Sequence, residues 1–319
     1  MLPYFDAHCD TITAALRTGQ GLRKNNLHLD LTRLRAYAPA GQVFALFLRP
    51  DNQDCTTGFS GPDCPYGILG PLFDAALAAL KRELAANSDL VQLCLNTDDI
   101  RAAAGAGKIA ALIAVEGAEQ LDCDVERLRA AYAAGVRLVN LTWNYPNALS
   151  GSNQAGGGLT EQGWHFLRAA QALGVAVDLS HISDAGFWDC LEFARKPLLA
   201  GHSNARALCP HPRNLTDEMF RALVRSGGVA GLNLCADFLG ADPDVETAAA
   251  HIEHFLALGG EKAVCLGTDF DGIDAAPRGI AGVQDMGALY ELLLRRNLPE
   301  SLVRDIFYNN FLAYLQRAL

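Results

Sequence analysis

The sequence lacks the features that mark several large classes of proteins. It contains no run of basic residues, and 26 Lys and Arg face 36 Asp and Glu, which gives a net charge of −10. This balance argues against nucleic acid or an anionic membrane surface as the partner. No stretch of about 18 uncharged apolar residues occurs, so we expect no membrane-spanning helix. No repeat, low-complexity segment or domain linker is visible, and we predict a single domain over residues 1–319.

Export signals are also missing, and the cysteines form no framework. The chain opens "MLPYFDAHCD", without the basic start and apolar core of a secretory signal. Cys94, Cys235 and Cys265 lie in apolar runs and are expected to be small buried hydrophobic residues. Cys55 and Cys64 flank a Gly- and Pro-rich loop and could pair, but without an export signal reduced thiols are the default. We therefore predict a cytoplasmic protein.

What the sequence does contain is a regular alternation of short apolar runs and longer helical patterns. The runs are rich in Val, Leu, Ile and Ala and are almost continuously apolar, which is typical of strands buried on both faces. We predict eight strands, at residues 2–8, 42–48, 109–117, 136–143, 175–181, 197–203, 228–234 and 263–269. Residues 90–95 could form an additional strand.

Helical patterns separate these strands. They lie at residues 72–86, 125–135, 160–174, 217–228 and 245–260, and several begin at an Asp or Thr cap and end at Gly. The alternation predicts an α/β fold, a (β/α)8 TIM-type barrel, with a doubly wound sheet as the alternative. The long stretch 49–70 follows the second strand, so in a barrel it would lie on the catalytic face, either as a lid or as a loop without fixed structure.

Polar side chains stand at the carboxyl ends of five of these strands. In a parallel barrel such ends meet on one face, so three histidines and three carboxylates would converge there. In a strand, residues two positions apart point the same way, so His8 and Asp10 could hold one ion. Imidazole and carboxylate ligands suit zinc with an open position. The set comprises His8, Asp10, Glu116, His181, His202 and Asp269.

A single histidine is more often a structural residue than a metal ligand. The prediction of a metal site therefore depends on all six residues together. The other histidines lie in loop or helix patterns away from the strand ends, and we take them as structural or surface residues. They are His28, His165, His211, His251 and His254.

Several short motifs carrying these residues resemble the membrane (renal) dipeptidase family, zinc metallopeptidases within the amidohydrolase superfamily. The matching pieces are "DAHCDT", "VEGAEQL", "DLSH", "GHSNAR" followed by "RN", and "GTDFDG". They occur in the family's order between residues 6 and 272, and the C-terminal helices, including "NNFLAYLQ", fit as well. The individual pieces are weak signals, whereas the set is highly specific.

The resemblance implies two zinc ions per chain. His8 and Asp10 would bind the first, His181 and His202 the second, and Glu116 would bridge both. A water or hydroxide shared by the ions would be the nucleophile, because two cations favour its deprotonated form. Asp269 would take its proton and pass it to the leaving amine, with Asp271 as the alternative carrier.

The resemblance also suggests substrate contacts. Arg213 stands where the family has an arginine that binds the terminal carboxylate of the substrate, and a guanidinium suits that role. Arg206 is a weaker candidate for binding this carboxylate. The alternative for Arg213 is a structural role, as a surface residue or as a partner in a helix cap. Trp143 replaces a family histidine that helps to bind the substrate and steady the oxyanion, so either its indole N–H or Asn144 substitutes, or the substrate differs from ordinary dipeptides.

These expectations amount to a dizinc dipeptidase that acts on a small peptide with a free carboxylate, with a D-residue tolerated on the carboxyl side. The resemblance further suggests a homodimer. An amidase or deacylase of N-acyl amino acids would use the same metals and Arg213. A non-catalytic metal-binding barrel is a third reading, which Trp143 permits and the retention of all six residues opposes.

Overall fold

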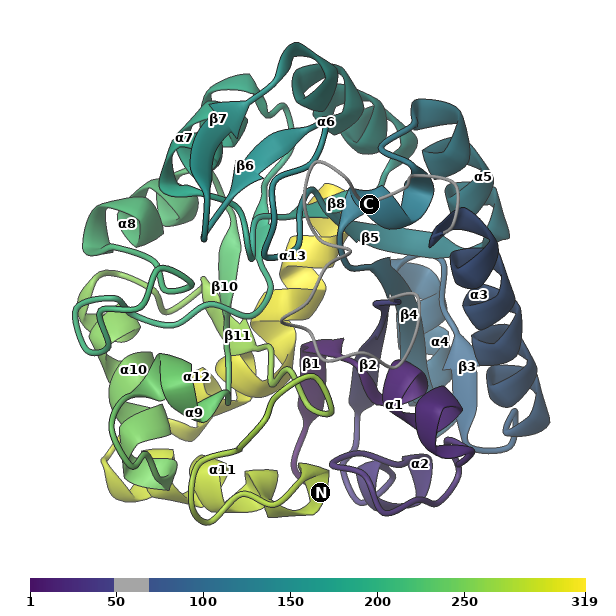
Figure 1. The fold of residues 1–319 in the computed structure, drawn as a ribbon. Helices are drawn as coiled ribbons and strands as arrows, with labels where there is room; N and C mark the ends of the chain where they lie inside the picture. The colour runs from purple at the N-terminus through teal and green to yellow at the C-terminus, as the bar shows by residue number, and fades with distance from the viewer. Residues whose placement is uncertain (49–68) are drawn as a thin grey trace.

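The computed structural model of the chain describes residues 1–48 and 69–319. Eight parallel strands close on themselves, because β1 pairs with both β2 and β11, and β2 also pairs with β4 (Figure 1). The predicted (β/α)8 barrel is thus confirmed. Its strands are β1 (Tyr4–Cys9), β2 (Ala40–Leu46), β4 (Ile109–Val115), β5 (Val136–Asn140), β8 (Ala176–Asp178), β9 (Leu199–Ala200), β10 (Val229–Leu232) and β11 (Val264–Leu266).

The additional strand that residues 90–95 suggested also forms. It is β3 (Val91–Leu93), which pairs with the first three residues of β4, whereas β5 pairs with β4 only from Ile113 onward. Since β2 runs along the other edge of β4, β3 and β5 share one edge in succession. The strand therefore extends the sheet without entering the closed ring.

Helices surround the barrel, and the five predicted ones form with small shifts at their ends. They are α3 (Leu69–Ala86), α5 (Val125–Ala134), α6 (Glu161–Leu173), α8 (Asp217–Arg225) and α10 (Val245–Ala257). Caps explain the boundaries: the side chain of Thr160 accepts a hydrogen bond from the backbone N–H of Gly163, and Gly174 ends α6 in the left-handed conformation. The remaining α-helices of the described residues are α1 (Thr11–Thr18), α2 (Leu31–Leu34), α4 (Thr97–Gly105), α7 (Asp184–Phe193), α9 (Ala236–Leu239), α11 (Met286–Arg295), α12 (Glu300–Arg304) and α13 (Asn310–Ala318).

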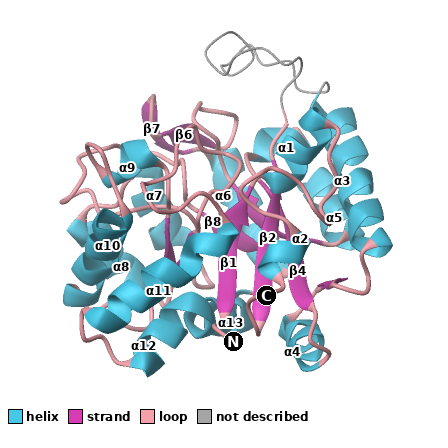
Figure 2. Ribbon diagram, turned by 90° about the horizontal axis from the view of Figure 1, so that it is seen from below, coloured by secondary structure: helices cyan, strands magenta, loops and turns pink. Residues whose placement is uncertain are grey.

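Two hydrophobic layers follow from the alternation of side chains along the strands. In β4, Ala110, Leu112 and Ala114 point into the barrel, whereas the residues between them pack against the surrounding helices. The inner layer includes Phe311 and Tyr314 of α13, which packs across the amino-terminal end of the barrel. Figure 2 shows α13 at that end, on the side opposite to the β6–β7 hairpin. One end of the barrel is thus closed by apolar side chains, and chemistry is confined to the other.

A small antiparallel hairpin at the carboxyl-terminal rim was not predicted. Its strands are β6 (Ser150–Ser152) and β7 (Gly156–Leu159). Gly is a poor strand former, and residues 150–158 contain no β-branched or aromatic residue, so the segment carries no β signal. A side chain on Gly151 would lie within 1.8 Å of the carbonyl oxygen of Gly156, so only glycine permits this close pairing.

Other expectations can be placed in the described parts of the chain. No helix there is long and apolar enough to cross a membrane. Cys94 and Cys265 are buried, as predicted, whereas Cys235 is only half-buried. The Cys55–Cys64 pair and most of the 49–70 stretch lie outside the described residues.

Candidate metal centre

The alternation of side chains along the strands explains why two of the predicted residues, Glu116 and Asp269, point into the barrel. The inward series of β4 continues to Glu116, the first residue after the strand, and the inward series of β11 runs through Cys265 and Gly267 to Asp269. Both carboxylates therefore project over the apolar interior at the carboxyl-terminal rim. Asp269 has a left-handed backbone, with φ of 61°, which turns the chain sharply at the end of the series.

His8 reaches the same place through an irregularity in β1. Asp6 pairs with Gln42 but Cys9 pairs with Phe44, so β1 contains one extra residue between these pairs. Such a bulge shifts the alternation by one residue, so that Ala7 points into the barrel while Cys9 points out of it. The bulge therefore turns His8 toward the interior. Asp10 follows as the cap of α1, not as part of the strand, which corrects the predicted strand geometry but leaves both residues on one side.

His181 and His202 stand beyond the ends of β8 and β9. His181 has a φ of 74°, which is unusual for a residue with a side chain and turns the chain inward. The buried carboxylate of Asp178 accepts hydrogen bonds from the backbone N–H groups of Ser180 and Gly201, each at 2.8 Å. It thereby ties the two loops together next to their histidines.

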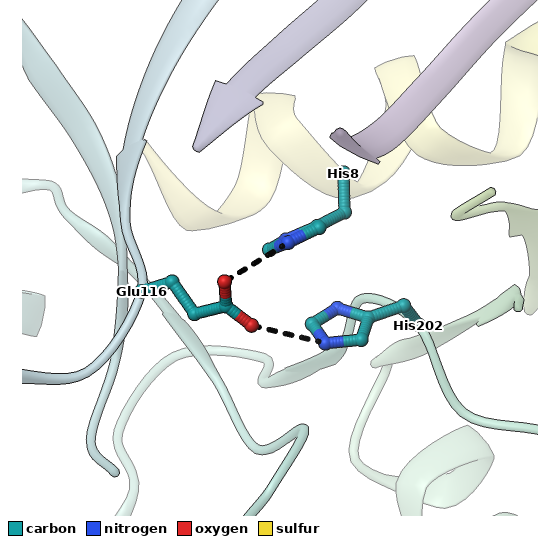
Figure 3. Close-up of side chains that lie close together, drawn as sticks. All are labelled: His8, Glu116 and His202. Carbon is teal, nitrogen blue, oxygen red and sulfur yellow. Dashed lines mark ion pairs between the residues drawn. The ribbon is translucent and has the colours of Figure 1, made fainter. Parts of the chain in front are cut away.

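The six predicted side chains meet in one cluster around Glu116. Figure 3 shows its carboxylate between His8 and His202, with one oxygen toward each ring. The distances are 3.5 Å from Oε2 to Nε2 of His8, and 3.6 Å from Oε1 to Nε2 of His202. Oε1 also lies 2.9 Å from Nε2 of His181. A carboxylate in this position can bridge two ions.

The carboxylates of Asp10 and Asp269 approach the same ring nitrogen as Glu116, namely Nε2 of His8. This nitrogen is 3.4 Å from Oδ2 of Asp10 and 4.0 Å from Oδ1 of Asp269. The ligand atoms of His8, Asp10 and Asp269 lie within 4.8 Å of one another, and so do those of His8, Glu116 and His202. Both compact groups share His8, and His181 adjoins them through Oε1 of Glu116 at 2.9 Å.

Burial sets the charge states of the cluster. Burial lowers the pKa of His181 to about 3, and the nearby Arg213 adds to the effect, while burial also holds the pKa of His202 well below its usual value. Burial opposes a charge on His8, but Glu116 and Asp10 outweigh it and raise its pKa. Two histidines are therefore neutral and can donate lone pairs. The third carries a proton that a metal ion would replace.

Several buried polar atoms of the cluster lack hydrogen-bond partners in the described parts of the chain. They are both ring nitrogens of His8, Oδ1 of Asp10 and Nδ1 of His202. Burying polar atoms without partners costs free energy, so such a group calls for an explanation. Imidazole nitrogens and carboxylate oxygens at these spacings are the donor set of zinc and related ions, so the residues present fit a metal site.

Arg213 is buried beside the cluster. Its Nη2 lies 3.0 Å from Nε2 of His181, and its guanidinium stacks on the ring of Phe238 at 5.3 Å. No carboxylate of the described residues forms an ion pair with it, and its Nε has no hydrogen-bond partner there. Arg206, the weaker candidate, instead forms a two-pronged ion pair with Asp184 at 2.6 and 2.7 Å.

Trp143 and Asn144 lie next to His181. The Trp143 ring stacks on Phe47 at 4.9 Å and on His181 at 5.9 Å between ring centroids. Oδ1 of Asn144 lies 2.8 Å from Nδ1 of His181. This contact uses the amide oxygen of Asn144, one of the two side chains predicted to touch substrate.

Two further residues support the site and were not predicted. Asn233 follows β10 and donates to Oδ2 of Asp269 at 2.9 Å, which leaves Oδ1 facing the cluster. A polar residue at the end of the apolar run 228–234 was the available signal. Asn153 of the hairpin donates to the carbonyl of His181, and no pattern in the sequence pointed to it.

The alternative proton carrier, Asp271, is engaged elsewhere. Its carboxylate accepts hydrogen bonds from Thr11 Oγ1 at 2.5 Å and from the backbone N–H of His28 at 2.6 Å. The remaining histidines also lie outside the two compact ligand groups; His211 Nδ1, for example, accepts a hydrogen bond from the backbone N–H of Arg213.

Barrel architecture and a rim cluster of histidines and carboxylates together define a metal-dependent hydrolase of the amidohydrolase type. Comparison with known families makes this specific, because the membrane dipeptidase family (peptidase family M19) matches residues 1–318. The chain belongs to this family, and it is an enzyme of the metallo-dipeptidase class.

Relatives agree with this assignment. The chain is 36% identical over 271 residues to a Klebsiella pneumoniae protein from the pqqA 5′ region, covering 81% of this chain and 98% of that protein. It is 33% identical over 266 residues to an uncharacterised dipeptidase of Schizosaccharomyces pombe, covering 80% and 64%.

Solved structures of the same family have the same fold. A Rhodobacter sphaeroides metallopeptidase, liganded with a phosphinate mimic of L-Ala-D-Ala, is 29% identical with a TM-score of 0.90, over 100% of this chain and 99% of that one. The dipeptidase AC, a family M19 metallopeptidase, is 28% identical with a TM-score of 0.91, over 99% and 98%.

Proposed function

We propose that the chain hydrolyses the peptide bond of dipeptides with two zinc ions. His8 and Asp10 would hold one ion, His181 and His202 the other, and Glu116 would bridge them. The observation that carries this proposal is the Glu116 carboxylate, which lies between His8 and His202 with one oxygen toward each. When bound, the ions would polarise the scissile carbonyl and lower the pKa of a shared water, so that hydroxide is available near neutral pH.

Asp269 would move the protons. Burial raises its pKa to about 6, so in the metal-free chain it can exchange a proton near neutral pH. Asn233 occupies Oδ2, so the proton would be taken up on Oδ1, the oxygen that faces His8. From there it would pass to the leaving amine as the peptide bond breaks.

Arg213 would bind the free carboxylate of the substrate. Its guanidinium is buried without an ion-pair partner among the described residues. A buried unpaired charge is costly, and an anionic ligand would relieve that cost by a two-pronged hydrogen bond. Its contact with His181 places that carboxylate next to the second metal pair.

The ligand of the Rhodobacter sphaeroides relative supports a D-residue on the carboxyl side of the substrate. Trp143 would contribute an aromatic wall beside His181, because its ring is stacked between Phe47 and that histidine. A small peptide substrate, a homodimeric state and a cytoplasmic location remain predictions that belong to the same proposal. Gel filtration with light scattering tests the dimer, and cell fractionation tests the location.

Two measurements test the chemistry. Metal analysis of the zinc-loaded protein should give two ions per chain, and a panel of dipeptides in both stereochemical series should show turnover. Cleavage of N-acetylated X-D-Ala compounds, without cleavage of the free dipeptides, would instead favour an amidase of N-acyl amino acids.

The proton carrier has its own test with a matched control. Asp269→Asn should lower kcat by about 10²–10⁴-fold while metal content stays near two. Asp271→Asn is the control, since that residue lies only two positions away and contacts Thr11 and His28 instead. If Asp269→Asn keeps full activity, the assignment of Asp269 is wrong.

A further inference from the structure

His181 differs from the other two histidines of the cluster in having a hydrogen-bond partner at ring Nδ1. Its carbonyl oxygen accepts hydrogen bonds from the backbone N–H of Asn153 at 2.8 Å and from Nδ2 of the same residue at 3.1 Å. Its ring Nδ1 lies 2.8 Å from Oδ1 of Asn144. By contrast, Nδ1 of His8 and Nδ1 of His202 are buried without a partner in the described chain.

The hydrogen bonds determine which way each amide points. Nδ2 of Asn153 donates both to the His181 carbonyl and, at 2.9 Å, to Oδ1 of Asn144. Asn144 therefore turns its oxygen toward both neighbours. An oxygen only accepts, so the His181 ring must donate through Nδ1–H. The lone pair is then on Nε2, which can accept from Nη2 of Arg213 at 3.0 Å and lies 2.9 Å from both Oε1 of Glu116 and Nε2 of His202.

The β6–β7 hairpin also contacts the backbone next to the Asn144–His181 hydrogen bond. Ser152 Oγ donates to the backbone carbonyl of Asn144 at 2.8 Å, and Ser152 also forms an isolated antiparallel bridge with Ile182. The hairpin thus attaches to the residues on either side of the contact. It connects the loop after β5 to the left-handed turn at His181.

We propose that Asn144 and Asn153 are positioning residues that fix the tautomer and orientation of His181 as a ligand of the second ion. The inference rests on the proposed two-ion function. It gives Asn144 a structural task at the metal instead of the substrate contact expected from the sequence. Hydrogen-bond partners of this kind orient ligand histidines and typically change metal affinity by about 10–100-fold when they are removed.

Near-isosteric variants test the proposal by equilibrium dialysis against Zn²⁺. Asn144→Leu removes the acceptor and should weaken one of the two zinc sites by about 10–100-fold, with activity restored by excess zinc. Asn144→Asp keeps an acceptor oxygen for both neighbours and should retain wild-type affinity. Asn153→Asp removes the amide donor and should weaken the same site, which keeps the proposal testable if Asn144→Leu does not fold.

The possible results distinguish an error in the positioning role of Asn144 from an error in the proposed two-zinc function. If Asn144→Leu binds two ions with unchanged affinity and shows only a raised KM, Asn144 contacts substrate and the positioning role is wrong. If both zinc sites weaken equally in Asn144→Leu, the effect is general and the proposal also fails. A wild-type chain that binds no zinc would instead overturn the proposed function, and the inference with it.

Discussion

The candidate metal centre has a first side with His8 and Asp10 and a second side with His181 and His202. A buried aspartate supports each side, but different elements hold the histidines beyond it. On the first side, the buried carboxylate of Asp6 accepts hydrogen bonds from the backbone N–H of His8 and from the backbone N–H and hydroxyl of Thr268. On the second side, Asp178 accepts from Ser180 and Gly201. Each aspartate thus joins two neighbouring strand ends that carry the candidate ligands.

The difference lies in what holds the ligands beyond these aspartates. His8 is still within β1, and a bulge in that strand suffices to aim it. His181 lies three residues beyond β8 with a φ of 74° and is held by Asn144 and the β6–β7 hairpin. Strand β1 and the start of α1 build the first side, whereas the second side depends on the β6–β7 hairpin. We therefore expect that a change on one side leaves metal binding on the other side largely intact.

Substitution of Glu116, which lies between the two sides, should have the largest effect on turnover and on metal binding. Glu116→Gln keeps the size of the side chain but loses the charge shared by His8, His181 and His202. We expect turnover at background level and weaker binding of both ions, measured by a dipeptide assay and by metal analysis after dialysis. Retention of two tightly bound ions would show that the sides do not need this bridge.

Breaking one side at a time should have an intermediate effect. Asp178→Ala leaves the N–H groups of Ser180 and Gly201 without their acceptor, which typically costs about 1–3 kcal/mol for each buried group. We expect a lower free energy of unfolding in urea and the selective loss of one zinc ion.

Asp6→Ala is the matched variant for the other side. It leaves His8 N and both Thr268 donors without their acceptor, so it should destabilise the chain at least as much. Here the ion at His8 and Asp10 should be lost first, as isothermal titration with zinc would show. If both variants weaken both ions alike, the two sides are one unit.

The smallest effect should be one of pH on the metal-free chain. Burial raises the pKa of Asp178 above its usual value, so the folded state holds this proton more tightly than the unfolded chain does. The resulting stability is fully present below the unfolded pKa of about 3.9 and is lost as the pH rises through the raised folded pKa.

Asp178→Asn removes this titration while keeping an oxygen for both N–H groups. The variant should therefore gain stability relative to the wild type as the pH rises, measured by urea unfolding across a pH series in the presence of a chelator. Parallel stability curves would show that Asp178 does not titrate in this way.

The contrast between the sides also explains what the sequence could predict. Long apolar runs ending in His, Asp or Glu identify residues such as Glu116 and Asp269, because strand alternation carries straight through to them. The barrel followed from the same runs. A bulge has no sequence signature of its own. The sequence therefore placed His8 beside Asp10 on the geometry of a regular strand, whereas in the structure they lie close together through a bulge and a helix cap.

Support from distant segments could not be predicted. Asn153 lies in a Gly- and Ser-rich stretch whose strands depend on close backbone approach, and its contact with His181 spans 28 positions of sequence. Asn144 was noticed only as a neighbour of Trp143, and its contact with the His181 ring depends on where two loops cross. Such contacts are properties of the folded rim and not of any local pattern.

The most direct test of the account is anomalous diffraction at the zinc edge from crystals grown with zinc. We predict two peaks on either side of the Glu116 carboxylate, one beside His8 and Asp10 and the other beside His181 and His202. An empty rim, or a single ion that leaves one pair of side chains without metal, would contradict the two-sided centre.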